Sequence, residues 1–387
     1  MAVYLDNAAT TPMVEPAIAA LVEALSHIGN ASSLHTFGRD SRRRVEEARE
    51  KIAAIAGCGA GEVIFTGSGT ESNNLAIKGL FWKRRAEDSK RNVVVVSAIE
   101  HHAVLDPAEW LEEHEGAELI LAPVDSEGVI DLGEFQKIVD EHGDRITCIA
   151  VMHANNEVGS IQPIADVVRI AGEIPVHCDA VQSFGKIDFN FAELGITSAT
   201  ISGHKVGGPL GVAALILKRG LDITPIMHGG GQERDIRSGT LNAPGIISFA
   251  AAAGFAAEHR DENSHYVEGL RTALIQTIQR EVPDAILNAA KAPHLPGIAN
   301  ITFPGTESDG LLLLLDAEEI ATSTGSACSA GVPRASHVLI AMGLTPRQAR
   351  SSLRFSLGIS NTMADIERLG EVIAAVVARS RAAMARN

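Results

Sequence analysis

Short apolar runs alternate with amphipathic stretches along the first 220 residues. The apolar runs predict buried strands at residues 62–66, 93–97, 118–122, 146–152, 175–179, 198–202 and 211–218. The stretches between them have the apolar spacing of helices, at residues 70–83, 104–114, 131–141 and 163–173. Strands and helices that alternate in this way indicate βαβ units. We therefore expect an α/β fold with a mainly parallel sheet that carries helices on both faces.

The two ends of the chain do not follow this alternation of short apolar runs and amphipathic stretches. Residues 12–56 are mostly helical in pattern, with charge pairs at helical spacing that end at Gly57. After about residue 245 an alanine-rich stretch predicts a long linking helix, and the rest mixes helices with strands, including a strand at 352–358 and a last helix at 362–384. We expect three parts: a large domain at residues 16–250, a smaller α+β domain at residues 251–387, and a segment at residues 1–15 that joins the small domain.

Composition and charge narrow the classes of function. Of the 387 residues, 45% are hydrophobic and 21% are charged, which suits a protein with a sizeable core. The net charge of −15 argues against broad nucleic-acid binding and against an anionic membrane surface. The chain has neither a signal-peptide pattern nor an apolar run of about 18 residues. Four cysteines do not make a disulfide framework, so we expect a cytoplasmic protein.

Lys205 and Asp179 each follow an apolar run that predicts a strand. A lysine at the end of a core strand is useful if desolvation deprotonates its amine, which can then condense with an aldehyde. An aspartate in the same layer can hold the protonated ring nitrogen of pyridoxal phosphate. The pair suggests this cofactor, but the chain must also supply a phosphate cradle, a ring contact and a substrate clamp.

Two further motifs follow predicted strands. Residues 65–74, FTGSGTESNN, place Gly69 and Thr70 where a helix N-terminus could hold a phosphate. The alternative is an ordinary strand–helix corner with Thr70 as the N-cap. His101 could stack on a planar cofactor or move protons. His101 and His102 are adjacent, a poor spacing for two ligands of one metal, and no cluster completes a shell, so we expect no metal site.

Four positions could contact a substrate or another anion. Asn156 could bind a cofactor hydroxyl or a carboxylate, or only form a loop. Arg354 suits a substrate carboxylate, with a structural ion pair as the alternative. Residues 228–240 end at Thr240 and could approach an anion, or form a flexible surface loop. Cys328 lies in a loop of small residues and could be a nucleophile, although a free loop cysteine is more often incidental.

The motifs become specific when they are taken in order. From residue 4 to residue 358 the chain contains YLDNAATTP, GNASSLH, FTGSGTESNN, IEHHAVLD, NNEVG, HCDAVQS, SGHK, GGGQERDIRSGT, STGSACSAG and SLRFSLG. Together they resemble the cysteine desulfurases of the NifS/IscS type, in the class V aminotransferase group of fold-type I pyridoxal-phosphate enzymes. SGHK and SACSAG are the most discriminating of them.

The resemblance implies a role for each candidate residue. Lys205 would bind the cofactor as a Schiff base, Asp179 would pair with the ring nitrogen, and Gln182 would bond the phenolic oxygen. His101 would stack on the ring and assist protonation. The phosphate would be held by Gly69, Thr70, Ser202, His204 and, from the other subunit of a homodimer, Thr240. Asn156 and Arg354 would clamp the substrate carboxylate, and Cys328 would accept the sulfur.

The implied reaction converts L-cysteine to L-alanine and leaves a persulfide on Cys328. An acceptor protein would then take the sulfur for iron–sulfur cluster assembly or tRNA thiolation. A selenocysteine lyase or another class V enzyme is the alternative. An aminotransferase of this class would have no use for Cys328.

Overall fold

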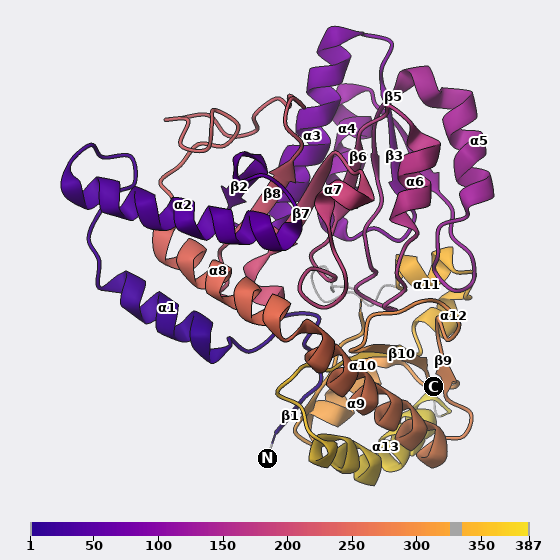
Figure 1. Ribbon diagram of the computed structural model, residues 1–387. Coiled ribbons are helices and arrows are strands. Elements are labelled where there is room, and N and C mark those ends of the chain that lie inside the picture. The colour runs from indigo at the N-terminus through magenta and orange to yellow at the C-terminus, as the bar shows by residue number, and fades with distance from the viewer. Residues whose placement is uncertain (1, 326–334, 386–387) are drawn as a thin grey trace.

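The main sheet follows the predicted order of strands and helices. The computed structural model describes residues 2–325 and 335–385, and within them seven strands form one sheet in the order β2-β8-β7-β6-β5-β3-β4 (Figure 1). All neighbours pair in parallel except β8, which is antiparallel to β2 and β7. The α/β class and the mainly parallel sheet are confirmed. The strands are β2 (Val63–Thr66), β3 (Val93–Ser97), β4 (Glu118–Ala122), β5 (Ile146–Ala150), β6 (Val176–Asp179), β7 (Ser198–Ser202) and β8 (Ala213–Leu217).

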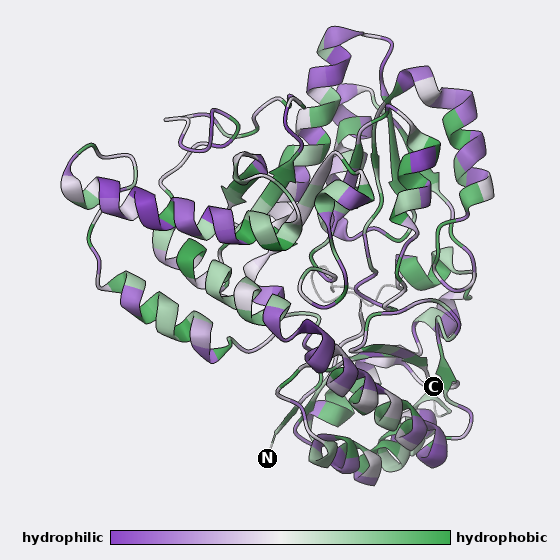
Figure 2. Cartoon of the chain, in the orientation of Figure 1, coloured by the Kyte–Doolittle hydropathy of each residue, from purple (hydrophilic) through white to green (hydrophobic). Residues whose placement is uncertain are grey.

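Helices cover both faces of this sheet because its central strands are apolar on both sides. In β3, Val94 and Val96 belong to one core cluster and Val93 and Val95 to another, as the alternation of a strand requires. The first cluster is closed by α3 (Gly69–Glu87) and α4 (His102–Glu115). The second is closed by α2 (Thr36–Ala56), α5 (Leu132–His142), α6 (Ile164–Ala171) and α8 (Ala243–Glu258), and α1 (Glu15–Leu25) packs on α8. Figure 2 shows apolar colour along the sheet and more polar colour on the outer helices.

A second core lies beside the sheet and contains residues from the first and the last described segments of the chain. Its antiparallel strands β12 (Ser352–Ser356), β10 (Ile298–Thr302) and β9 (Ile286–Leu287) pack with α9 (Arg260–Glu281), α10 (Ser308–Asp316) and α13 (Met363–Met384). At the N-terminus, β1 (Val3–Tyr4) pairs in parallel with β11 (Ile320–Ala321). Val3 and Leu5 are buried in this second core. Short helices α7 (Phe191–Leu194), α11 (His337–Ala341) and α12 (Pro346–Ala349) complete the helices of the described residues.

The carboxyl ends of the parallel strands bring the sequence motifs to one edge of the sheet. β6 ends at Asp179, and β7 ends at Ser202 and continues into a 3₁₀ turn at Gly203–Lys205. In open α/β sheets this edge is where ligands bind. No helix among the described residues is long and apolar enough to cross a membrane.

Candidate active site

A pocket at this edge brings most of the predicted residues together. Its volume is about 1230 Å³ including the open mouth. Among the residues that line it are Gly69, Thr70, His101, Asn156, Asp179, Gln182, Ser202, His204, Lys205 and Arg354. Of the predicted residues that the structure describes, only Thr240 does not line the pocket, and its side chain is exposed. Cys328 lies outside the described residues, but Gly325, which precedes it by three positions in the sequence, lines the pocket.

The amine of Lys205 points to the N-terminal segment. Its Nζ donates hydrogen bonds to the carbonyl oxygens of Ala8 and Ala9, at 2.5 and 2.7 Å. The turn that carries Lys205 is compact because Gly203 and Gly208 approach closely: a Cβ on Gly208 would lie 2.9 Å from the carbonyl oxygen of Gly203. The motif SGHK therefore places the lysine in a compact turn at the end of β7.

The surroundings of Lys205 favour its neutral form. Burial lowers its pKa to about 7, and the like charges of Lys186 and Arg354 act in the same direction. Asp6 and Asp179 oppose this shift with smaller effects. A large fraction of the amine is therefore unprotonated near neutral pH, as a nucleophilic or basic lysine requires.

A buried hydrogen-bond chain fixes the carboxylate of Asp179. Its Oδ2 accepts from Asn73 Nδ2 at 2.7 Å, and its Oδ1 accepts from the backbone N–H of Val181 at 2.9 Å. Asn73 Oδ1 then faces His177 Nε2 at 2.9 Å, and His177 Nδ1 faces the Ser198 hydroxyl at 2.9 Å. Because Asn73 can only accept at Oδ1, His177 must carry its proton on Nε2. Burial lowers the pKa of His177 to about 3, so this ring is neutral.

The N-terminus of α3 supplies free N–H groups at the other end of the pocket. Ser68 is the N-cap and accepts from the Glu71 N–H at 3.1 Å, so the alternative in which Thr70 caps the helix is wrong. Gly69 and Thr70 are the first helical residues, where an anion finds unpaired N–H groups and a favourable dipole. His204 nearby is neutral, because burial, with the charges of Lys205 and Lys186, lowers its pKa to about 4.

His101 joins the end of β3 to α4 and is the N-cap of that helix. Its Nδ1 accepts from the Ala103 N–H at 3.0 Å, which leaves the proton of the neutral ring on Nε2. The ring is exposed to the pocket, yet desolvation by the surrounding protein lowers its pKa; the charge of Asp179 opposes this shift, and that of Lys205 adds to it. A neutral ring with a proton on Nε2 can both stack on a flat ligand and donate a proton.

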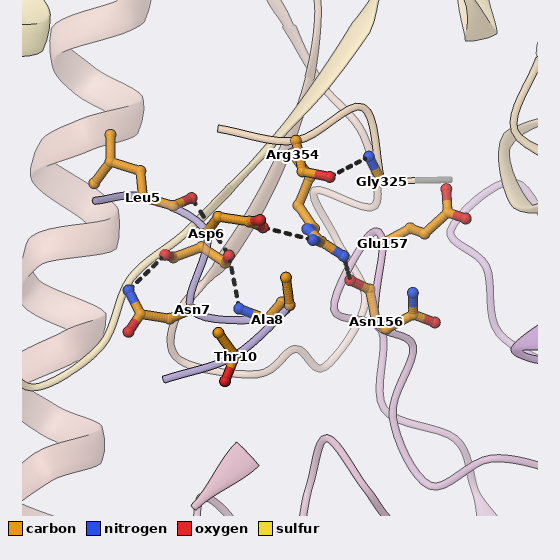
Figure 3. A network of polar contacts seen from close by, with 12 residues as sticks. Leu5, Asp6, Asn7, Ala8, Thr10, Asn156, Glu157, Gly325 and Arg354 are labelled. Carbon is orange, nitrogen blue, oxygen red and sulfur yellow. Dashed lines mark hydrogen bonds and ion pairs between the residues drawn. The ribbon is translucent and has the colours of Figure 1, made fainter. Parts of the chain in front are cut away.

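Arg354 lies almost fully buried on β12, with 4% of its surface exposed. One terminal nitrogen donates to Asp6 Oδ1 at 2.7 Å and the other to the carbonyl oxygen of Asn156 at 2.9 Å (Figure 3). Its Nε has no partner among the described residues. The structural ion pair, which was the alternative for Arg354, therefore exists, with Asp6, and Arg354 also lines the pocket.

Several residues that shape this site were not predicted from the sequence. They are Asp6, Asn73, Glu157 and Lys186. Three of them lie inside quoted motifs, YLDNAATTP, FTGSGTESNN and NNEVG, so position in a motif was the available signal. Glu157 also lines the pocket, and its carboxylate accepts from the Ser336 hydroxyl at 2.5 Å.

The described residues contain no group of three or more His, Cys, Asp or Glu side chains that could hold a metal ion.

Burial raises the pKa of Cys58 and of Cys148 to about 12, and raises that of Cys178 as well, so these thiols stay protonated.

The donor set fits pyridoxal phosphate. The pocket offers a lysine amine with a low pKa for an aldehyde, a fixed carboxylate for a ring nitrogen and a helix N-terminus for a phosphate. A Cβ added at Gly69 would lie only 3.1 Å from Val181 Cγ2, so the backbone at this helix start is closely packed.

Comparisons with known proteins agree with this geometry. Residues 3–369 match the model of the aminotransferase class-V family. The sequence is 48% identical to an IscS-like cysteine desulfurase of Mycobacterium tuberculosis, over 98% of this chain and 97% of the relative. The fold is similar to a NifS-like protein, with 35% identity and a TM-score of 0.90, over 98% of this chain and 100% of that one. It is also similar to SspA in complex with cysteine, with 32% identity and a TM-score of 0.80, over 93% and 99% of the two chains.

Proposed function

The chain belongs to the aminotransferase class-V family, and from this premise we propose that it is a pyridoxal-phosphate-dependent cysteine desulfurase. It removes sulfur from L-cysteine, releases L-alanine and leaves a persulfide on Cys328. The observation that carries the proposal is one pocket that holds the amine of Lys205, the carboxylate of Asp179 and, at its wall, Gly325.

The residues at the two ends of the pocket would hold the cofactor. Lys205 would bind its aldehyde, Asp179 its ring nitrogen and Gln182 its phenolic oxygen. The phosphate would meet Gly69, Thr70, Ser202 and His204. When bound, the cofactor supplies an electron sink for the carbon that loses a proton.

The chain's own groups then handle the substrate and its protons. Arg354 and Asn156 would hold the carboxylate of L-cysteine, with Arg354 fixed from behind by Asp6. Lys205 Nζ, a large fraction of which is unprotonated near neutral pH, would accept the proton from the substrate's Cα. His101 would donate its Nε2 proton as L-alanine forms, which is consistent with its role as an N-cap through Nδ1.

The sulfur step balances without an external oxidant or reductant. The Cys328 thiolate attacks the substrate sulfur, so that a sulfur–sulfur bond forms and the carbon–sulfur bond breaks. The carbon keeps the electron pair and takes a proton, which gives L-alanine. The net reaction is one thiol plus L-cysteine to one persulfide plus L-alanine. The persulfide then passes to an acceptor protein, in iron–sulfur cluster assembly or tRNA thiolation.

The test is to incubate the purified holoprotein with L-cysteine and to quantify L-alanine, sulfide and the mass of the Cys328 peptide. We expect L-alanine and a gain of one sulfur on Cys328 in the wild type, and neither in Lys205→Ala. Cys328→Ser should lose the persulfide and most of the turnover, whereas Cys58→Ser, at a thiol kept protonated by burial, should keep both. Wild-type sulfide release in Cys328→Ser would refute the assignment of the nucleophile. A preference for L-selenocysteine, or a need for a keto acid, would identify another class V reaction.

The homodimer belongs to the same proposal. Large apolar side chains are exposed along α1 and the turn to α2, namely Val22, Leu25, Ile28, Leu34 and Phe37, at 61–84%. Such a patch is typical of a surface that another chain covers. The exposed Thr240 would then reach the phosphate end of the partner subunit's pocket. Light scattering should give twice the mass of the chain, and Phe37→Glu should reduce it; a wild-type monomer at micromolar concentration would contradict this.

We also propose a domain organisation and a cellular location for the protein. The large domain would span residues 16–250 and the small domain residues 251–387, with residues 1–15 joined to the latter. The pairing of β1 with β11 and the burial of Leu5 in the second core support this division. The cytoplasm is proposed as the location, supported by the protonated free thiols of Cys148 and Cys178.

A further inference from the structure

Lys186 lies directly behind the proposed active site. It lines a second cavity, of about 780 Å³ including its open mouth, which Lys205 and Ala8 also line. Burial lowers the pKa of Lys186 to about 8, with the charge of Arg354 as the second cause. Among the described residues no carboxylate offsets its charge, and its Nζ donates to Gln182 Oε1 at 3.3 Å. Lys186 is therefore a partly buried cation whose side chain reaches the back of the pocket.

The contact with Lys186 determines which way the Gln182 amide points. An ammonium group can only donate, so it must face Oε1, and a backbone carbonyl can only accept, so it must face Nε2. Gln182 Nε2 accordingly donates to the carbonyl oxygen of Ala8 at 2.9 Å. The same oxygen accepts from Lys205 Nζ at 2.5 Å. Lys186, Gln182, Ala8 and Lys205 thus form one continuous hydrogen-bonded path.

This path is anchored from the second core as well. The Ser264 hydroxyl on α9 donates to the carbonyl oxygen of Lys186 at 2.6 Å. The Lys186 N–H donates to the carbonyl oxygen of Ser183 at 2.9 Å. The backbone of Lys186 is therefore held from both cores, and its side chain has a fixed origin behind the pocket.

The charges around Lys205 show what Lys186 contributes there. Lys186 and Arg354 disfavour the protonated amine, and Asp6 and Asp179 favour it. His204 and His101, which also line the pocket, have lowered pKa values and are neutral near pH 7. Arg354 is already paired with Asp6 at 2.7 Å. Lys186 is therefore the cation near Lys205 whose charge no described carboxylate balances.

We propose that Lys186 is a positioning residue of the active site, which holds the Gln182 amide with Nε2 toward the Ala8 carbonyl oxygen that Lys205 also binds, and which presents a like charge to Lys205. It touches neither substrate nor cofactor. The part that concerns the Gln182 amide rests on the proposed function, because Gln182 is the residue that would bond the cofactor's phenolic oxygen. The part that concerns Lys205 holds for the protein without cofactor.

The first test uses the full chain after removal of the cofactor. The rate at which an amine reagent modifies Lys205 is followed across pH by peptide mass spectrometry. The wild-type midpoint should lie near 7. In Lys186→Met it should rise by about half a pH unit or more, the scale on which one neighbouring like charge acts. Lys186→Arg should leave it at or below the wild-type value. Lys137→Met, which removes an exposed lysine on α5, should not change it. A wild-type midpoint in Lys186→Met would overturn the electrostatic part.

The second test uses the holoprotein and the visible absorbance of its cofactor. The pH midpoint of the spectral change should shift in Lys186→Met and remain in Lys186→Arg and Lys137→Met. An unchanged midpoint in Lys186→Met would overturn the positioning of Gln182. If the Met variant does not fold, Lys186→Gln replaces it in both tests. If the wild type binds no pyridoxal phosphate, the proposed function fails, and the first test still decides the effect on Lys205.

Discussion

Charged residues around Lys205 shift its pKa in opposite directions. In the proposed mechanism Lys205 accepts a proton from the substrate, which its protonated amine cannot do, so activity should fall as the pH drops through about 7. Asp6 raises the pKa of Lys205, and removing its charge should lower that pKa. In Asp6→Asn the acid limb of the pH profile of kcat should therefore move to lower pH. Asp6 also fixes Arg354, so KM for L-cysteine should rise several-fold. An acid limb that stays in place or moves to higher pH would contradict this prediction.

Glu157 offers a second test at the residue scale, because it joins the two sides of the segment that contains Cys328. Its Oε2 accepts from Ser336 at 2.5 Å, and a Cβ on Gly325, whose φ is +85°, would lie 3.1 Å from the same oxygen. Glu157→Ala leaves the buried Ser336 hydroxyl without this acceptor and should cost about 1–3 kcal/mol of unfolding free energy. Glu157→Gln keeps an acceptor oxygen and should avoid most of that cost.

The pH dependence of stability tests the charge state of Glu157 separately from its hydrogen bond to Ser336. Burial raises its pKa above 4.5 in the fold, so the folded state binds the proton more tightly than the unfolded state. The resulting stabilisation is present at low pH and is lost as the pH rises through the folded pKa. Glu157→Gln lacks this loss, so its stability relative to the wild type should increase between about pH 4 and about pH 8. Urea unfolding of both proteins at the two pH values measures this difference in stability. A difference that decreases with rising pH would show that the fold stabilises the charged form of Glu157.

At the scale of elements, α3 contributes to the pocket in two places: its first turn lines the part where we propose that the phosphate binds, and its second turn fixes Asp179. In Asn73→Leu the Asp179 carboxylate loses a donor and the His177 Nε2 proton loses its acceptor. We expect a loss of about 1–3 kcal/mol of unfolding free energy and weaker cofactor binding. Asn74→Leu is the matched control, since the side chain of Asn74 bonds, among the described residues, only the Thr70 carbonyl of its own helix. Equal effects of the two variants would show that the buried chain does not support Asp179.

The strands and helices of the large sheet were predictable because their patterns are strong. The run VVVVS is buried over its whole length in β3, and Gly57 ends α2 with a positive φ, as its glycine suggested. The helix α9 was harder to place, because its charged stretch RDENSHYVEG has a weak apolar stripe and is held by tertiary packing. β1 and β11 are two residues long, and only their pairing across the whole sequence defines them.

At the scale of the whole molecule, the sequence motifs located the pocket but not the contacts that tune it. Lys205 and Asp179 were recognisable because lysine and aspartate at strand ends have a specific chemistry. The carbonyl oxygens of Ala8 and Ala9 carry no sequence signal, and neither does the approach of Lys186 to Gln182. These contacts arise where segments from the N-terminus, the large sheet and the second core meet, so they depend on the complete fold.

The N-terminal segment contacts both the second core and the pocket, and the buried side chain of Leu5 holds it in the second core. Leu5 is fully buried in the second core, while Asp6 and Ala8 just beyond it contact Arg354 and Lys205. Leu5→Ala should cost about 2–5 kcal/mol of unfolding free energy, because it leaves a cavity in that core. It should also loosen the carbonyl oxygens that hold Lys205, so cofactor binding should weaken. Leu313→Ala, at a leucine of α10 that is 71% exposed, should change neither quantity appreciably. Urea unfolding and cofactor titration of both variants measure these two quantities. A Leu5→Ala protein that is destabilised but binds the cofactor normally would show that the burial of Leu5 does not affect the active site.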